Sequence, residues 1–136
     1  MKVAGLPSIV LGEEAMAGEY ALFSCHLPSG WSSSAELPVV DAVPPMADTA
    51  LENEAAVKGS IMLVSRGTVP FYDKVKRASA AGAAAVVVFN TEDELFKMSA
   101  DDGCTSDIPV LMIKSSDAPR LRNHGRARLR KLGRIT

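Results

Sequence analysis

The stretch Gly59–Asn90 restricts the fold more than any other part of the chain. It contains two continuous apolar runs, Gly59–Ser65 and Ala84–Phe89, of the kind that form strands buried on both faces of a sheet. A segment with helical periodicity lies between them. A strand, a helix and a second strand in this order pair the two strands in parallel through a right-handed crossover. The sequence therefore predicts an α/β domain with a strand–helix–strand unit over residues 60–90.

The helix of this unit is predicted over residues 71–82, where apolar and small side chains recur on one stripe at helical spacing. The stripe consists of Phe71, Val75, Ala78 and Gly82. Pro70 suits the entry of a helix, and Asp73 in the first turn interacts favourably with the positive end of the helix dipole. The turn Arg66–Phe71 therefore joins a buried strand to a helix N-terminus.

The rest of the chain is predicted to add strands and two shorter helices. Apolar runs bounded by turn residues predict strands at Pro7–Leu11, Tyr20–His26, Leu37–Val43, Ile108–Lys114 and Arg126–Leu132. Residues 12–19 are predicted to be a turn, residues 91–98 a short helix, and Ser116 the N-cap of a helix that runs to about Asn123 and stops at Gly125. Because strands outnumber helices, we expect a twisted β-sandwich or open barrel of about seven strands, flanked by two or more helices.

Composition and charge restrict the classes of function. With 136 residues, of which 47% are hydrophobic, the chain is predicted to form a single domain, 1–136, with its own core. The net charge of −1 does not favour nucleic acid or anionic lipid as a partner. The arginines that follow Asp117 are interpreted as a solvated face that guards a terminal edge strand. No apolar run is long enough to span a membrane or to form a signal-peptide core.

The sequence contains no motif of an enzyme, a metal site or a cofactor site. Its histidines and cysteines, His26, His124, Cys25 and Cys104, are widely spread and match no zinc pattern. A catalytic Cys–His dyad would combine His124 with Cys25 or Cys104. Neither cysteine lies in an activating context such as a helix N-terminus. No dinucleotide-binding or P-loop fingerprint occurs. We therefore expect a non-catalytic chain without metal or cofactor, with buried thiols and with surface or capping histidines.

The Arg66–Phe71 turn is the strongest candidate for a binding site. In folds with parallel strands, ligands gather at the carboxyl ends of the strands. The turn offers a guanidinium group and free backbone N–H groups at a helix start, which together can hold a carboxylate or a peptide backbone. It has no group that transfers protons near pH 7. The alternative interpretation is that Arg66 pairs with an acidic neighbour, and we expect Phe71 to enter the core.

These residues resemble the pattern of the protease-associated (PA) domain family. The family's Gly-x-Ile-x-Leu-Val-x-Arg-Gly stretch, followed by a Phe, a Lys-Val helix, Ala-Gly-Ala and a strand ending in Asn, has clear counterparts here. They are Gly59–Gly67, Phe71, Lys74-Val75, Ala81-Gly82-Ala83 and Val86–Asn90, with the later family element at Met98 and Ile108–Ile113. The resemblance covers about Leu37 to Leu132, and it implies a PA-like sandwich or open barrel.

The resemblance also implies a protein-binding or peptide-binding module without catalysis. PA domains are similar to lids or inserts on peptidases and to ectodomains of sorting receptors and membrane ubiquitin ligases, and in sorting receptors the Arg-Gly loop contacts the cargo peptide. The implied partner is a protein or peptide ligand, or a protease domain of the parent chain. Carried over by position, the peptide-binding residues are Arg66, Gly67, Thr68 and Val69, to which the neighbouring strand end adds Asn90 and Thr91.

One departure from the family pattern affects the loop and the compartment. The motif cysteine falls on Val69, and no cysteine occupies the region before Gly59 that usually supplies its partner. The usual disulfide therefore cannot form, which leaves the rigidity of the loop to packing and to Pro70. The resemblance suggests a secretory or endomembrane lumen, but the missing disulfide and the missing signal peptide leave the cytoplasm open. Two other functions stay as alternatives: a swivelling-type phosphocarrier using His124, and a hydrolase using Cys104 or Cys25.

Overall fold

The computed structural model describes residues 7–12, 14–24 and 36–131. Within these residues, eight strands form one sheet in the order β2-β1-β8-β4-β5-β6-β7-β3. The strands are β1 (Pro7–Leu11), β2 (Glu14–Ala17), β3 (Glu19–Tyr20), β4 (Leu37–Asp41), β5 (Ile61–Ser65), β6 (Ala85–Phe89), β7 (Val110–Ile113) and β8 (Arg126–Lys131). The helices are α1 (Glu54–Val57), α2 (Phe71–Ala80) and α3 (Ala118–His124), the last preceded by the 3-10 turn η1 (Ser115–Asp117).

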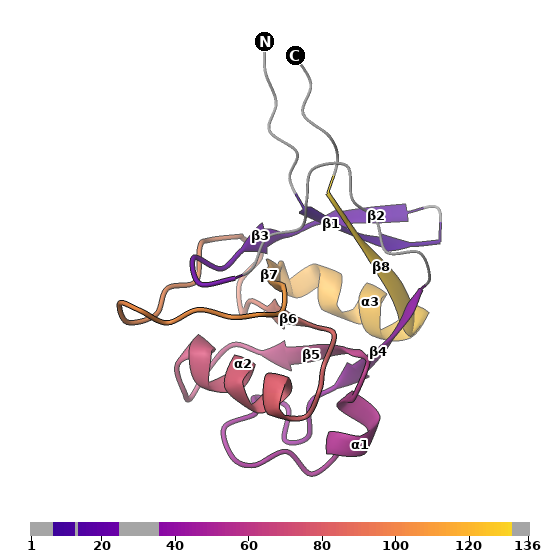
Figure 1. Ribbon diagram of the computed structural model, residues 1–136. Coiled ribbons are helices and arrows are strands. Elements are labelled where there is room, and N and C mark those ends of the chain that lie inside the picture. Colours follow the sequence, from indigo (N-terminus) through magenta and orange to yellow (C-terminus); the bar gives the residue numbers. More distant parts are fainter. Residues whose placement is uncertain (1–6, 13, 25–35, 132–136) are drawn as a thin grey trace.

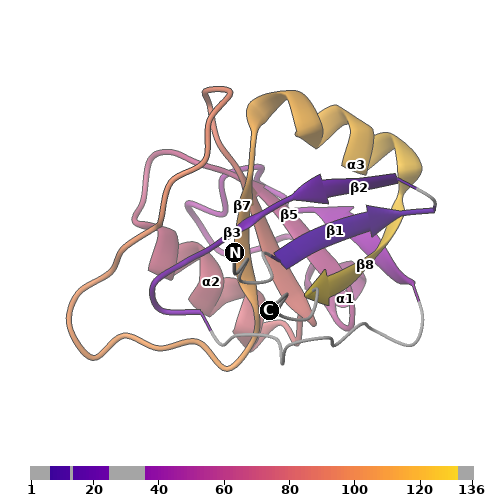
Figure 2. The ribbon, with the colours of Figure 1, turned by 90° about the horizontal axis from the view of Figure 1, so that it is seen from above.

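The sheet curls into a nearly closed barrel, as Figures 1 and 2 show from two directions. Its two end strands are adjacent in the chain: β2 pairs with β1, β3 pairs with β7, and only Gly18 separates β2 from β3. The chain segment 14–20 therefore brings the two ends of the sheet together. This architecture confirms the predicted open barrel with flanking helices.

The predicted strand–helix–strand unit is confirmed as β5, α2 and β6. The two strands pair in parallel from Ile61 opposite Ala85 to Ser65 opposite Phe89, and β4 and β7 extend the parallel set on either side. Alternate side chains of β5 and β6 pack in two different clusters. One cluster fills the barrel beneath α3, and the other lies beneath α2. Burial on both faces explains why these strands are continuous apolar runs.

Two predictions for the first part of the chain are wrong. The segment predicted as a turn contains β2, and of the predicted strand Tyr20–His26 only Tyr20 is in a strand among the described residues, as the second residue of β3. The chain leaves the sheet after Tyr20 because the Ser24 N–H bonds back to Ala21 O at 3.1 Å, while the Ser24 hydroxyl accepts the Val110 N–H at 2.8 Å. A side chain thus replaces the backbone partner that a longer strand would provide. Cys25 and His26 lie outside the described residues.

The helix predicted at residues 91–98 does not form, and Ser116 is not an N-cap. Residues 91–98 form bends and extended chain. The Asp93 carboxylate in this segment accepts hydrogen bonds from Ser116 N at 2.9 Å and Ser115 Oγ at 3.3 Å. It therefore caps η1, which leads into α3, from a distant part of the chain. The end of α3 is as predicted, with Gly125 at φ 79°.

The last strand is also placed differently from expectation. β8 is not an edge strand, because it pairs with β1 on one side and β4 on the other. Its buried side chains, Ala127 and Leu129, belong to the cluster inside the barrel. The other predicted strands are found with ends that shift by at most two residues. Among the described residues, no helix has the length and apolar character needed to cross a membrane.

Candidate functional site

The Arg66–Phe71 turn lies where the parallel strands β5 and β6 end at the same edge of the sheet. Ser65 is opposite Phe89 in the register, so Arg66 and Asn90 follow at neighbouring positions. Arg66 Nη1 donates a hydrogen bond to Asn90 Oδ1 at 2.9 Å. The guanidinium carbon lies 4.9 Å from the centroid of the Phe96 ring. The structure thus brings together two residues that the sequence proposed for one site.

The partner of Arg66 is a neutral amide and an aromatic ring, so the interpretation that Arg66 pairs with an acidic neighbour is wrong. The guanidinium is half-buried, and stacking on the Phe96 ring adds a cation–π attraction. Phe96 was not among the residues predicted for the site, because it lies in an irregular segment where no local sequence pattern marks it. Phe71 packs against the cluster beneath α2, as predicted, and its ring centroid lies 5.9 Å from that of Phe96.

Asn90 lies beneath the surface of the site. Its side chain is fully buried, and Oδ1 accepts a second hydrogen bond from Thr91 N at 2.8 Å. Its Nδ2 donates to Glu94 O at 2.8 Å. Asn90 therefore orients Arg66 and the chain that follows β6. Thr91, in contrast, is exposed.

The backbone of the turn has an unusual conformation. Gly67 has φ 126° and Thr68 has φ 70°, and Val69 N donates to Gly67 O at 2.8 Å, which closes a γ-turn on Thr68. Positive φ at a residue other than glycine costs about 1–3 kcal/mol and persists only where the surroundings enforce it. Within the described part of the chain, the N–H groups of Gly67 and Thr68 have no hydrogen-bond acceptor. Two main-chain donors are therefore available next to Arg66.

Lys74, in the first turn of α2, holds this conformation in place. Its side chain is fully buried, and its Nζ donates to Gly67 O at 2.6 Å and to Met46 O at 2.5 Å. Burial lowers the pKa of Lys74, an effect that the negative charge of Asp48 opposes. One turn further along α2, Arg77 Nη1 donates to Ala47 O at 2.8 Å. Two cations of one helix thus bind the carbonyl groups of two loops.

The Lys74 side chain is hydrogen-bonded to the Arg66–Val69 loop. This is the loop that lacks the usual disulfide of the family. The contacts of Lys74 therefore add to the packing and to Pro70, to which the sequence assigns the rigidity of the loop. A signal for Lys74 was present in the sequence, because it lies three positions after Phe71 and one before Val75. That position is on the buried stripe of the helix, and a lysine there needs hydrogen-bond acceptors.

The second loop joined by Lys74, Val43–Ala47, follows β4 and lies against the Arg66–Val69 loop. Ser65 N donates to Pro45 O at 2.9 Å, and Thr68 Oγ1 lies 3.0 Å from Met46 Sδ. A Cβ placed on Gly67 would come within 3.3 Å of the same sulfur. The two loops therefore form one continuous surface at the end of the parallel strands. We refer to Val43–Ala47 and Arg66–Val69 as the paired loops.

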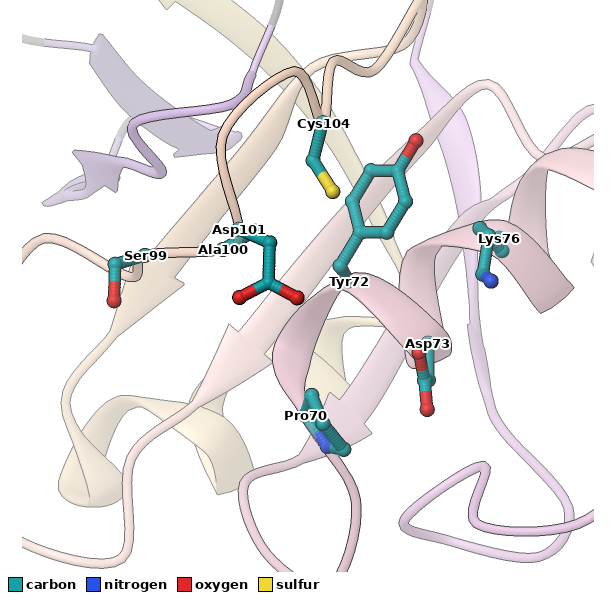
Figure 3. A pocket seen from close by; sticks show the side chains of 8 residues that line it. All are labelled: Pro70, Tyr72, Asp73, Lys76, Ser99, Ala100, Asp101 and Cys104. Carbon is teal, nitrogen blue, oxygen red and sulfur yellow. The ribbon is translucent and has the colours of Figure 1, made fainter.

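A hollow of about 440 Å³ lies beside the start of α2 (Figure 3). It is lined by Pro70, Tyr72, Asp73, Lys76, Ser99, Ala100, Asp101 and Cys104. Cys104 is a free, half-buried thiol, and the lining contains no histidine to activate it. His124 is exposed at the end of α3. In the described segments, no group of three or more His, Cys, Asp or Glu residues is arranged to hold a metal ion.

Comparisons with known proteins agree with this architecture. A model of the PA domain matches residues 35–121. The chain is 40% identical over 77 residues to aminopeptidase YwaD of Bacillus subtilis, covering 56% of this chain and 17% of that protein. It is 34% identical over 109 residues to signal peptide peptidase-like 3 of Arabidopsis thaliana, covering 78% of this chain and 20% of that protein.

The solved structures include a similar fold within a larger chain. The structure of BSAP, a zinc aminopeptidase from Bacillus subtilis, aligns over 97% of this chain and 32% of its own, with a TM-score of 0.69 and 25% identity. The chain thus spans between one sixth and one third of the length of these relatives. The family match runs from β4 into α3 and includes both paired loops. The chain belongs to the PA domain family.

Proposed function

We propose that this PA domain is a non-catalytic module that binds an extended segment of protein at the Arg66–Phe71 loop. The segment is either a free peptide or part of a neighbouring domain, such as the protease domain of a parent chain. The relatives named above are an aminopeptidase and a signal peptide peptidase-like protein, and this chain covers only 17% and 20% of them, which supports a peptidase context. The domain contributes recognition, and the chemistry belongs to its partner.

One observation carries this proposal: the loop presents unused donors in a fixed geometry. The N–H groups of Gly67 and Thr68 lack acceptors within the described residues, and Arg66 uses only Nη1 in its hydrogen bond to Asn90. Main-chain donors bind the carbonyl oxygens of an extended peptide, and a guanidinium group binds a carboxylate. Donors that are already held in place bind with a smaller loss of conformational entropy.

Each candidate residue then has a distinct role. Gly67 and Thr68 supply main-chain donors, and Arg66 supplies the positive charge. Val69 closes the γ-turn and is half-buried, so it shapes the loop. Asn90 orients Arg66 from below, whereas the exposed Thr91 lies at the rim of the same strand end.

The test is an NMR titration of the isotope-labelled chain with a pool of random linear peptides. We expect shifts that cluster at residues 66–71 and at Thr91. The Arg66→Ala variant should bind the responding peptides about ten to a hundred times more weakly, because it loses a hydrogen bond to a charged group. Arg128→Ala removes an exposed arginine from β8 and serves as the matched control. The proposal fails if no peptide shifts any resonance, or if Arg66→Ala and Arg128→Ala bind alike.

A further inference from the structure

The Val43–Ala47 loop has every backbone carbonyl group engaged. Val43 O accepts Glu52 N, Pro44 O accepts Ala47 N, Pro45 O accepts Ser65 N, Met46 O accepts Lys74 Nζ and Ala47 O accepts Arg77 Nη1. The Val43 N–H in turn donates to Asn53 Oδ1 at 3.2 Å. A loop with this many fixed carbonyl groups has a single well-defined shape. Its side chains are therefore displayed in a constant arrangement.

This loop nevertheless exposes apolar side chains. Among the large apolar residues that the structure describes, Leu22, Val43 and Met46 are the exposed ones, and two of these three belong to the same short loop. Val43 is 42% exposed and Met46 is 37% exposed. A core role would bury these side chains, and a purely solvated loop would not need a buried lysine to fix it. An apolar surface on a rigid loop is typical of a contact site.

The thioether of the exposed Met46 lies beside the two residues that carry the free main-chain donors. Met46 Sδ is 3.0 Å from Thr68 Oγ1, and it would be 3.3 Å from a Cβ on Gly67. Successive residues of an extended peptide rise by about 3.3 Å, and their side chains alternate between two faces of the backbone. A peptide carbonyl held by the N–H of Gly67 or Thr68 therefore brings the side chains on one face of the peptide within reach of Met46. Methionine adapts its shape to different aliphatic groups.

We infer that Val43 and Met46 form an aliphatic-side-chain subsite next to the Arg66 loop. Its occupant is an extended protein segment that combines an aliphatic residue on Met46, a main-chain carbonyl on Gly67 or Thr68 and a carboxylate on Arg66. The main-chain contacts provide affinity, whereas the apolar contact and the charge select the sequence. This inference rests on the proposed function, because it names the class of peptide that the same site takes.

The test selects a displayed library of random linear peptides on the full chain and on four variants. The wild-type chain should enrich peptides with an aliphatic residue at a fixed spacing from an acidic one. Met46→Ser should lose the aliphatic enrichment and keep the acidic one, whereas Arg66→Ala should do the reverse. Met46→Leu restores the apolar surface and should restore the aliphatic preference. Leu22→Ser alters an exposed apolar residue elsewhere and should select the same peptides as the wild-type chain.

Affinities of one selected peptide complete the test. Met46→Ser should bind it about tenfold more weakly than Met46→Leu, because an aliphatic contact loses its apolar partner. Unchanged thermal unfolding of the variants shows that the surface change leaves the fold intact. If Met46→Ser keeps the aliphatic enrichment while Arg66→Ala loses the acidic one, the subsite is refuted and the peptide-binding function stands. If the wild-type chain enriches no peptide, the proposed function and the subsite both fall.

Discussion

Lys74 Nζ lies 2.6 Å from the carbonyl oxygen of Gly67. A fully buried ammonium group thus fixes the loop that precedes its own helix, and it binds Met46 O of a second loop at the same time. A buried charge is tolerated only where polar partners replace its hydration. In this chain the partners are carbonyl groups of the paired loops, so the folding of the core and the shape of the candidate site depend on one side chain.

Replacement of Lys74 by methionine should destabilise the protein and release the loop. Two carbonyl groups would lose the buried ammonium group that donates to them, at a cost of about 1–3 kcal/mol each. We expect a decrease in the free energy of unfolding of about 2–4 kcal/mol in urea denaturation, together with faster amide exchange at Val69, whose N–H donates to Gly67 O. Lys76→Met, an exposed position of the same helix, is the control. Equal unfolding midpoints for the two variants would contradict this role of Lys74.

The lowered pKa of Lys74 has a consequence for the dependence of stability on pH. Because burial lowers the pKa in the folded state, the unfolded chain binds more protons at Lys74 in the window just below the ordinary lysine pKa. The stability contributed by this group is therefore greatest above that ordinary pKa and decreases as the pH falls through the folded-state pKa. The free energy of unfolding of the wild type should therefore rise, relative to that of Lys74→Met, from pH 8 towards pH 10. A difference that stays constant over this range would show that Lys74 titrates normally.

Asp93 should make the protein sensitive to acid. Hydrogen bonds from Ser116 and Ser115 lower the pKa of the Asp93 carboxyl group. Its contribution to stability is present above the ordinary aspartate pKa and is lost as the pH falls through the folded-state value. Asp93→Asn should therefore reduce the loss of stability between pH 5 and pH 2, measured by thermal unfolding. The control is Asp102→Asn, at another exposed aspartate, which should keep the wild-type dependence of stability on pH. If Asp93→Asn also keeps the wild-type dependence, the prediction is refuted.

Asn90→Ala should weaken both the fold and the site. It removes the acceptor of Arg66 and Thr91 and the donor to Glu94 O. We expect a loss of about 2 kcal/mol of stability, because the variant loses three hydrogen bonds of a fully buried side chain. The Arg66 side-chain resonances should also show greater mobility. Asn123→Ala, at an exposed position of α3, is the control and should change neither the stability nor the mobility of Arg66. If the Asn90→Ala variant is as stable as the wild type and its Arg66 side chain stays immobile, Asn90 does not position Arg66.

Much of the candidate site was predictable from sequence. The two apolar runs around α2 define parallel strands, and the carboxyl ends of neighbouring parallel strands lie at the same edge of a sheet. The proximity of Arg66 and Asn90 therefore follows from the sequence pattern. The buried stripe of α2 and the stop at Gly125 are equally local signals, because helical spacing and a left-handed glycine leave marks in a short window.

Only the tertiary structure decided the features that depend on distant partners. Whether β8 is an edge or an interior strand depends on β1 and β4, and Asp93 caps a helix that begins more than twenty positions later. The hydrogen bond from Lys74 to Met46 O likewise joins residues 28 positions apart. A sequence pattern shows which face of an element is buried, but it does not show what lies against that face. For that reason the sequence determined the strand–helix–strand frame and its Arg-Gly loop, whereas the contacts that fix the loop were decided by the three-dimensional packing.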